Sequence, residues 1–201
     1  MDTYLSRLPR ILQHLTILLK DRGYIPPLFP SSTEEIISSA LERNCSIGQC
    51  LTFKMAHVSH KRQLLVAFLD PIFDSSKNKE IMTSAYQIHG VLDEFLTQGE
   101  HALIVCYGKL SPDASKEVNK LRKRNIQVIV HTSLTFPISQ HVMTRPHIAM
   151  EEAEAVEWEK ENRIKRSQLP ILKYNDPVRV WYGWPKDTVV KIERGAFRVV
   201  K

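Results

Sequence analysis

Hydrophobic residues near the start of the chain recur at intervals of three and four positions. The longest such pattern runs from Leu5 to Leu19 and is followed by basic residues and Gly23. This spacing predicts an amphipathic helix that ends near the glycine. A second helix is predicted to run to about Arg43, because Ser32 or Thr33 can be its N-cap and two glutamates occupy the first turn.

Short apolar runs in the middle of the chain predict the strands of a buried sheet. The predicted strands are residues 45–54, 63–69, 102–106 and 127–131. The predicted helices between them are residues 81–98 and 111–124. Strands that alternate with helices are typical of a small α/β domain.

The pattern changes again in the last third of the chain. An acidic helix is predicted over residues 151–161, and Pro170 stands near the start of a short strand that Gln168 begins. Asp176 and Pro177 predict the start of a very short helix that ends at Gly183. Residues 188–192 and 196–200 then predict a hairpin. We expect two domains, residues 1–133 and 134–201, joined by a proline-containing loop.

The motifs of this last third resemble those of a known protein family. In chain order they are His141 and His147, Gln168-Leu169-Pro170, Asp176-Pro177, Tyr182-Gly183 and Val189-Val190-Lys191-Ile192. Their order and spacing are similar to those of the C-terminal assembly domain of the fifth common subunit of eukaryotic nuclear RNA polymerases and of its archaeal counterpart. The final hairpin is shorter than the family's, so contacts of the missing residues are not transferred.

The resemblance implies a fold and a function. The fold would be α/β (α+β): a jaw-like N-terminal α/β domain with a small mixed sheet, and a small C-terminal α/β assembly domain. The chain would be a non-catalytic subunit of a multisubunit DNA-directed RNA polymerase. Its C-terminal domain would dock on the largest subunit, beside other polymerase subunits, and its N-terminal domain would lie near downstream double-stranded DNA. It would need no cofactor, because the catalytic magnesium belongs to other chains.

The resemblance and the local chemistry together give candidate site residues. Those expected at the subunit interface are His141, His147, Gln168, Leu169, Pro170, Asp176, Pro177, Arg179, Trp181, Tyr182 and Gly183. Arg179 and Trp181 are included because exposed aromatic residues with an arginine nearby are typical of protein interfaces. Those expected near DNA are Ser111, Pro112, Ala114, Lys109, Lys116, Lys120 and Lys123, of which the lysines are included for their positive charge. Ser111, Pro112 and Ala114 look like members of the family's Thr-Pro-Ser-Ala motif. Asp113 departs from it and would repel phosphate, so direct DNA contact and a simple helix start both stay open.

Composition bears on where in the cell the protein is expected. The chain has 201 residues, a formal net charge of +6 and three cysteines. No apolar run is long enough to cross a bilayer, and an odd number of cysteines fits a reducing compartment, so we expect an intracellular protein without a membrane partner. The divergent N-terminal half favours a large cytoplasmic DNA virus of the African swine fever virus type, in which case the protein would be in host cytoplasm and virion. The alternative is a divergent protist subunit in the nucleus.

The residues were also compared with three alternatives: a zinc site, a nuclease and a free DNA-binding regulator. Cys45, Cys50, His57 and His60 could be zinc ligands, but their spacing is loose. Asp70 ends a predicted strand, as an acid of a nuclease site could, but a nuclease would also need an acidic residue two positions before Lys109, where Tyr107 stands. A free DNA-binding regulator is a third alternative, since the net charge favours an acidic partner weakly.

Overall fold

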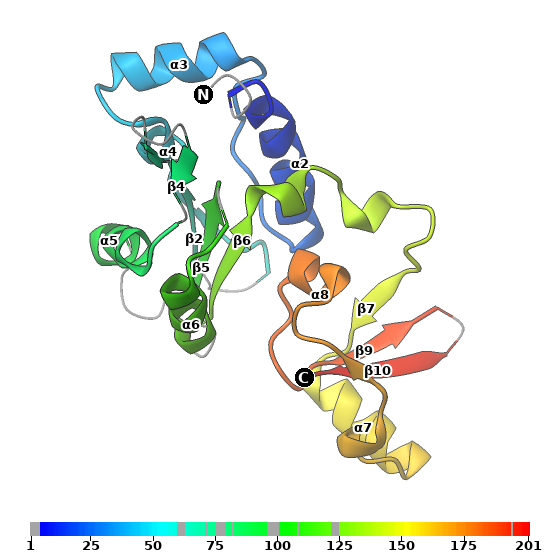
Figure 1. Ribbon diagram of the computed structural model, residues 1–201. Helices are drawn as coiled ribbons and strands as arrows, with labels where there is room; N and C mark the ends of the chain where they lie inside the picture. The colour runs from blue at the N-terminus through cyan, green and yellow to red at the C-terminus, as the bar shows by residue number, and fades with distance from the viewer. Residues whose placement is uncertain are drawn as a thin grey trace. The chain divides into compact units, whose positions relative to one another are not determined.

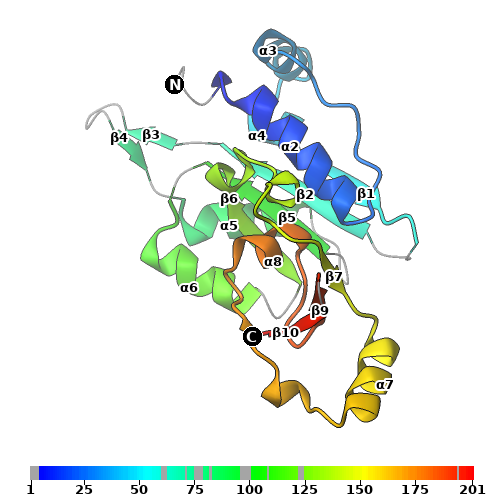
Figure 2. The same cartoon turned by 90° about the vertical axis from the view of Figure 1, so that its right-hand side faces the viewer.

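The computed structural model divides the chain into two compact units, one ending at Phe136 and one from Pro137 to Lys201. It describes residues 5–59, 63–70, 72–74, 79–81, 83–95, 101–107, 109–121, 125–193 and 195–201. Each unit combines helices with its own four-stranded sheet, so the protein is of the α+β class (Figures 1 and 2). None of the helices in these ranges is long and apolar enough to span a membrane.

The N-terminal unit is built on a mixed sheet. Its strands are β1 (Phe53–Ala56), β2 (Gln63–Leu69), β5 (His101–Cys106) and β6 (Ile126–Val130), in the order β1-β2-β5-β6. The β1–β2 pair is antiparallel, whereas β2, β5 and β6 are parallel. β3 (Ile72–Asp74) and β4 (Lys79–Ile81) form a separate antiparallel hairpin that the sequence did not predict.

Helices cover both faces of this sheet. The helices are α2 (Leu8–Asp21), α3 (Thr33–Glu42), α4 (Ile47–Cys50), α5 (Ala85–Phe95) and α6 (Pro112–Leu121), and the 3-10 turn η2 (His131–Leu134) follows β6. α5 and α6 share a buried core with alternate residues of β2, β5 and β6. α2 lies on the opposite face in both views and buries Leu8, Ile11, Leu12, Leu15, Leu18 and Leu19 (Figures 1 and 2).

The predicted first two helices are confirmed, and several other predicted boundaries are wrong. Residues 45–54 do not form one strand, because the Ser46 side chain accepts from the Gln49 N–H and starts α4. Ile81 ends β4, so the helix predicted from it begins only at Ala85. β6 stops one residue before His131, where η2 begins.

The C-terminal unit has a sheet of four short strands. They are β7 (His147–Ala149), β9 (Val189–Ile192), β10 (Ala196–Val200) and β8 (Ile171–Leu172), in the order β7-β9-β10-β8. Only the β10–β8 pair is parallel. The unit also contains α7 (Glu152–Asn162), α8 (Pro177–Tyr182) and the 3-10 turns η3 (Ile138–Gln140) and η4 (Arg166–Gln168). The predicted strand start at Gln168 is therefore wrong: that residue closes η4, and β8 begins at Ile171.

Two small cores hold this sheet. On one face Val189 and Val199 pack with Ala155 of α7, and the Trp158 ring packs against the Phe197 ring at an angle of 31°, with ring centroids 4.1 Å apart. On the other face Val190 and Val200 pack with Leu172, Tyr174 and Trp184. Alternate residues of β9 and β10 thus point into different cores, as the period of a strand requires.

Candidate functional site

A tight turn in the C-terminal unit exposes two apolar side chains. In this 141–144 turn the Thr144 N–H donates to the His141 carbonyl at 2.8 Å, and the Met143 N–H donates to His141 Nδ1 at 3.1 Å. Val142 and Met143 at its tip are 94% and 80% exposed. Large apolar residues this exposed, side by side, are typical of a surface that a partner covers. The predicted interface residue His141 thus shapes the turn.

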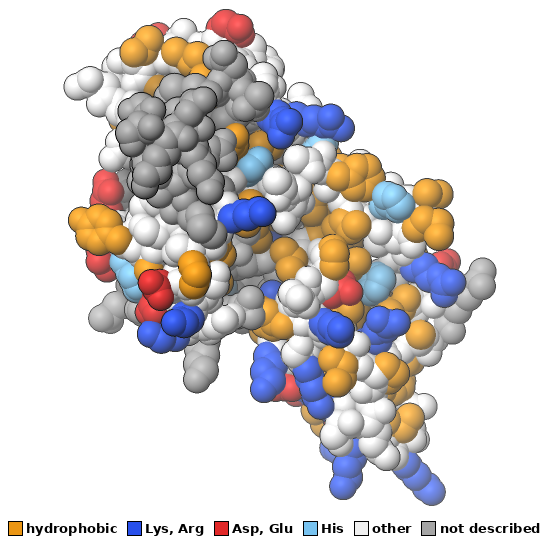
Figure 3. Space-filling view, in the orientation of Figure 1, with side chains coloured by type: hydrophobic (Ala, Val, Ile, Leu, Met, Phe, Trp, Pro, Cys, Tyr) orange, Lys and Arg blue, Asp and Glu red, His pale blue; other side chains and the backbone are white. Residues whose placement is uncertain are grey.

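The chain runs from this turn into an edge strand. His147 Nδ1 lies 2.6 Å from the Arg145 carbonyl oxygen, so the second predicted histidine also contacts the backbone of its own segment. Ile148, the middle residue of β7, is 63% exposed. Its partner across the ladder is Lys191, which is also exposed. In Figure 3 hydrophobic, histidine and basic side chains lie next to one another on the C-terminal unit.

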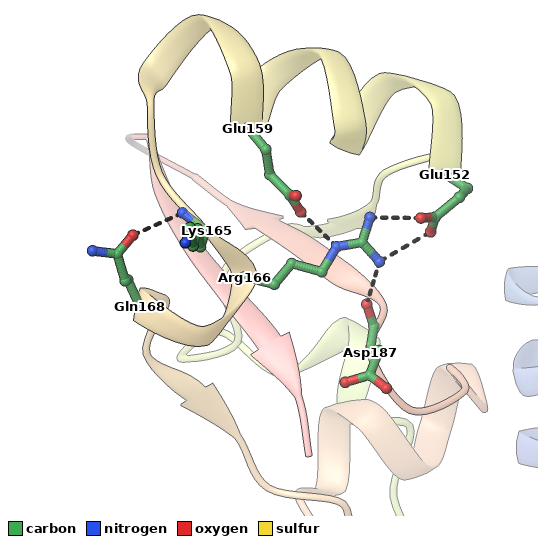
Figure 4. Close-up of polar contacts among 6 residues, drawn as sticks. All are labelled: Glu152, Glu159, Lys165, Arg166, Gln168 and Asp187. Atoms are coloured by element: carbon green, nitrogen blue, oxygen red, sulfur yellow. Dashed lines mark hydrogen bonds and ion pairs between the residues drawn. The ribbon is translucent and has the colours of Figure 1, made fainter.

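A network around Arg166 fixes the segment that carries Gln168, Leu169 and Pro170 (Figure 4). The guanidinium contacts both carboxylate oxygens of Glu152, at 2.6 and 3.1 Å, and one carboxylate oxygen of Glu159 at 2.5 Å. It also donates to the Asp187 carbonyl at 3.1 Å, and so joins α7, η4 and the turn before β9. The hydrogen bond from Arg166 holds the pKa of Glu152 below its usual value, and the two carboxylates raise the pKa of Arg166.

The anchored segment presents some of its predicted residues and hides others. Gln168 and Pro170 are exposed, whereas Leu169 is 8% exposed and belongs to the core under α7. The Gln168 side chain accepts from the Lys165 N–H at 2.8 Å, and the Pro170 carbonyl accepts from the Val199 N–H at 3.0 Å. This part of the predicted interface is therefore a hydrogen-bonded turn that exposes one polar residue, Gln168, and one apolar residue, Pro170.

Helix α8 is built as its sequence predicts. The Asp176 side chain accepts from the Val178 N–H at 2.9 Å, Pro177 is the first helical residue, and Gly183 ends the helix with φ 71°. Tyr182 stacks on Trp184 with centroids 4.7 Å apart and an interplanar angle of 5°. The short helix and its aromatic end are thus held in one conformation.

Two predicted interface residues of α8 are buried. Arg179 and Trp181 are 4% and 2% exposed. Arg179 Nε donates to the Trp184 carbonyl at 2.7 Å, and its guanidinium carbon lies 3.4 Å from the centre of the Tyr174 ring. The expectation of an exposed arginine and tryptophan at this helix is therefore wrong, because a unit this small uses its large side chains for its own core.

The predicted DNA-proximal residues surround the start of α6. Ser111 accepts from the Ala114 N–H at 3.1 Å, so it is the N-cap, and Ala114 is fully buried. Pro112 and Lys109 are exposed. Lys116 lies 3.7 Å from Asp113, and Lys120 lies 2.8 Å from Glu117.

These ion pairs change the electrostatics of the helix. Each of the two described lysines of α6 has a carboxylate three residues before it, so the helix does not carry the uninterrupted positive stripe that its lysine spacing predicts. Lys123 lies outside the described residues.

The residues considered for metal or nuclease chemistry have structural partners. His57 Nε2 lies 3.0 Å from the Arg22 carbonyl oxygen, and its Nδ1 accepts from the Ser59 N–H at 3.0 Å. Cys50 accepts from Arg43, and its pKa is raised, mainly by burial. Asp70 accepts from the Gly48 N–H at 2.8 Å. His60 lies outside the described residues, and the described ranges contain no cluster of three metal-ligating side chains.

The sequence reasoning missed several residues of the C-terminal surface. Val142, Met143 and Ile148 were not selected, although apolar residues in a segment with His, Arg and Pro were a usable signal. Arg166 was not selected either. Glu152 and Glu159 are seven residues apart on α7 and so lie on one face, which was a signal for a bridging cation.

Comparison with known proteins shows that the C-terminal unit is similar to a known domain family. Residues 136–197 match the family model described as RNA polymerase Rpb5, C-terminal domain. This segment contains the 141–144 turn, β7, the Arg166 network and α8.

Similar proteins extend the comparison. The chain is 31% identical over 100 residues to "DNA-directed RNA polymerases I, II, and III subunit rpabc1" of Dictyostelium discoideum, a match that covers 48% of this chain and 51% of the relative. It is 25% identical over 203 residues to "DNA-directed RNA polymerases I, II, and III subunit RPABC1" of Caenorhabditis briggsae, covering 96% and 90%. The protein of the same name in Caenorhabditis elegans is 29% identical over 94 residues, covering 46% and 44%.

The alignments with the Dictyostelium and C. elegans proteins span about half of those proteins, and the alignment with the C. briggsae protein spans nearly all of it. The similarity is to non-catalytic subunits of an RNA polymerase. Together, the family match over residues 136–197 and these relatives show that the chain is similar to the Rpb5 subunits of RNA polymerases.

Proposed function

We propose that the protein is a non-catalytic subunit of a multisubunit DNA-directed RNA polymerase and docks on the largest subunit through its C-terminal unit. The observation that carries the proposal is the family match over residues 136–197, which coincides with one compact unit of the structure. The exposed apolar residues of the 141–144 turn support a covered surface on this unit. Relatives of the chain are named as subunits of DNA-directed RNA polymerases, and we assign the same role to this chain.

Docking is tested by affinity purification of the tagged full-length protein from its source cells, followed by mass spectrometry. The wild type should recover the two largest polymerase subunits. The double variant Val142→Ser/Met143→Ser should recover much less of them, because it removes exposed apolar surface without touching a core. Tyr86→Ser is the matched control, since Tyr86 is 85% exposed on α5 of the other unit.

Recovery of the wild-type protein without either large subunit would overturn the proposal. Substituting Trp181 would be a poorer test, because its side chain is 2% exposed and its loss would disturb folding.

The proposal places the start of α6 near downstream DNA. Lys109, Lys116 and Lys120 are exposed there, and the helix N-terminus adds partial positive charge. The contact would be weak and independent of base sequence, since Asp113 and Glu117 neutralise two of the lysines.

DNA contact is tested with the assembled polymerase carrying Lys109→Gln/Lys116→Gln/Lys120→Gln. Binding to a downstream duplex should depend less steeply on salt, by about one in the logarithmic slope for each lysine that contacts phosphate. Lys186→Gln, an exposed lysine of the C-terminal unit, is the control. An unchanged slope in the triple variant would refute the DNA contact and leave the docking proposal intact.

The cellular location follows from the polymerase that the chain serves. The three relatives belong to eukaryotic organisms, and the proposal therefore favours the nucleus. A viral source, with host cytoplasm and virion as the location, stays a prediction that these relatives do not support. Immunofluorescence of the source cells distinguishes the two, since cytoplasmic factories and nuclei are spatially separate.

A further inference from the structure

Strand β7 is an edge of the C-terminal sheet. β9 lies on one side of it, and among the described strands none pairs with its other side. The strand is antiparallel to β9, with Ile148 opposite Lys191. An edge strand presents a row of backbone groups that can pair with another chain.

The ladder fixes which backbone groups point outward. The Glu193 N–H donates to the Pro146 carbonyl at 3.2 Å, and the Met150 N–H donates to the Val189 carbonyl at 2.9 Å. In an antiparallel ladder hydrogen-bonded pairs alternate with non-bonded ones. The backbone groups of His147 and Ala149 therefore point away from β9.

The side chains around this edge combine apolar and basic groups. Ile148 is 63% exposed and shares a sheet face with Lys191, because directly paired residues point the same way. Arg145 is exposed just before the strand, and two carboxylates are exposed nearby: Glu193, whose N–H donates to the Pro146 carbonyl, and Glu151, two residues after β7. The edge therefore offers an apolar position with the cation of Lys191 beside it on the same face.

We propose that β7 accepts an extended segment of the large polymerase partner as an added strand, with an apolar residue beside Ile148 and carboxylates near Arg145 and Lys191. This inference rests on the proposed docking function and specifies its geometry. The N–H and C=O groups of His147 and Ala149 would pair with the added backbone, and the neighbouring side chains would select its sequence. The exposed tip of the 141–144 turn, which leads into β7, would extend the covered apolar surface.

A second copy of this chain is the other occupant that could pair with the edge. Antiparallel pairing of β7 with its own copy, centred on Ile148, would put Arg145 opposite Glu151 of the copy, so charge does not exclude self-association. We favour the polymerase partner because β7 lies within the segment that matches the family model of an RNA polymerase subunit. The exchange experiment below separates the two occupants.

Hydrogen–deuterium exchange tests the backbone contact directly. The probe is the complex of the full-length protein with the co-purified largest polymerase subunit, compared with the isolated protein. The amides of His147 and Ala149 should exchange at least about 10-fold more slowly in the complex, since each would then be hydrogen-bonded. Docking through side chains alone would leave their exchange unchanged and would overturn the inference.

The variant Ala149→Pro removes an outward N–H and no bond of the β7–β9 ladder. We expect it to reduce recovery of the largest subunit about 10-fold or more, through the lost hydrogen bond and the bulk of the ring at the edge. Ala149→Ser keeps the N–H and is the matched control. Lys191→Glu leaves the backbone unchanged and should weaken recovery several-fold at low salt, which gives a second test should the proline variant unfold.

The outcomes separate this inference from the function it rests on. Folded Ala149→Pro that recovers the largest subunit at the wild-type level would overturn strand addition and leave docking standing. A wild type that recovers no polymerase subunit would overturn both. Protection of the His147 and Ala149 amides in a dimer of the isolated protein would overturn the choice of partner.

Discussion

Replacing Arg166 by methionine should lower the free energy of unfolding of the C-terminal unit by about 2 kcal/mol. Methionine keeps an unbranched side chain of similar length and removes every hydrogen bond of the guanidinium. Arg166 joins α7 through Glu159 and Glu152 and joins the turn before β9 through the Asp187 carbonyl (Figure 4). Its loss therefore disconnects three segments at one point.

The magnitude follows from how exposed each contact is. The side chains of Arg166 and Glu159 are 23% and 22% exposed, so this partly buried pair contributes about 1 kcal/mol. The bond to the Asp187 carbonyl contributes about 1 kcal/mol. Glu152 is 75% exposed, and water screens its ion pair.

Tryptophan fluorescence during urea unfolding isolates this unit. All three tryptophans, Trp158, Trp181 and Trp184, lie in the C-terminal unit. A double-mutant cycle with Glu159→Gln should give a coupling energy of about 1 kcal/mol. Arg145→Met is the control for loss of an exposed arginine. A change of less than about 0.5 kcal/mol for Arg166→Met would refute the assignment of the network as a structural clamp.

The contribution of the Arg166 network to the free energy of unfolding should depend on pH. Arg166 holds the pKa of Glu152 below its usual value, so the folded state binds this proton less readily than the unfolded state does. The contribution is then fully present above the ordinary carboxyl pKa and is lost as the pH falls through the lowered one. Between about pH 5 and pH 3 the wild type should lose stability more steeply than Arg166→Met. Parallel curves for the two proteins would contradict this.

Three further predictions concern single positions. Asp176→Ala should lower the free energy of unfolding by about 1 kcal/mol in the same fluorescence assay, because the Val178 N–H loses its cap, whereas Asp176→Asn should not. Cys106, whose pKa burial raises to about 11, should react with iodoacetamide at pH 8 only after urea unfolding; peptide mapping that finds Cys106 rapidly labelled in the folded protein would contradict its burial, whereas labelling of the partly exposed Cys45 and Cys50 would not. Gly48→Ala should destabilise the N-terminal unit by about 1–3 kcal/mol in circular-dichroism melts, because the added Cβ would lie 2.6 Å from the Phe68 carbonyl oxygen; an unchanged melting temperature would refute the crowding.

The elements that sequence predicted well are those whose ends carry local chemistry. Ser32 and Asp176 each accept a backbone N–H of their own first turn, and Gly183 has the positive φ that a glycine allows. These signals involve residues a few positions apart, so no tertiary information is needed. The central strand β2 was predictable for a related reason, since its residues from Leu64 to Leu69 are all buried.

The errors arose where a local signal competed with a broader pattern. Ser46 and Gln49 form a capping box inside what was assigned as one strand, and the capping box determined the structure. Ile81 was assigned to a helix but pairs with Ile72 in the β3–β4 hairpin. Strand pairing depends on the partner's register, which one segment does not encode by itself.

The candidate interface shows most clearly the difference between what sequence motifs indicate and what only the three-dimensional structure shows. The family motifs lie within the segment that the family model matches, but they did not distinguish residues that build the unit from residues that face outward. Arginine is a residue type that is common at interfaces, yet the Arg179 side chain lies inside the unit. It packs over the Tyr174 ring and donates a hydrogen bond to the Trp184 carbonyl. That placement depends on the chain folding back after Gly183, and it is visible only in three dimensions.

The two predicted histidines hold the exposed apolar residues of the C-terminal unit in position. His141 and His147 each contact the backbone of the segment between them, and this segment carries the most exposed apolar side chains of the described C-terminal unit. A fixed turn loses little conformational entropy when a partner covers it, so its exposed side chains contribute more of their burial to affinity. The histidines would therefore act on docking by positioning Val142 and Met143, and the fold would supply the neighbouring open edge of β7. The histidines can be found from the sequence, because they belong to a motif with a fixed order and spacing. The open edge of β7 cannot, because it exists only once the sheet has formed.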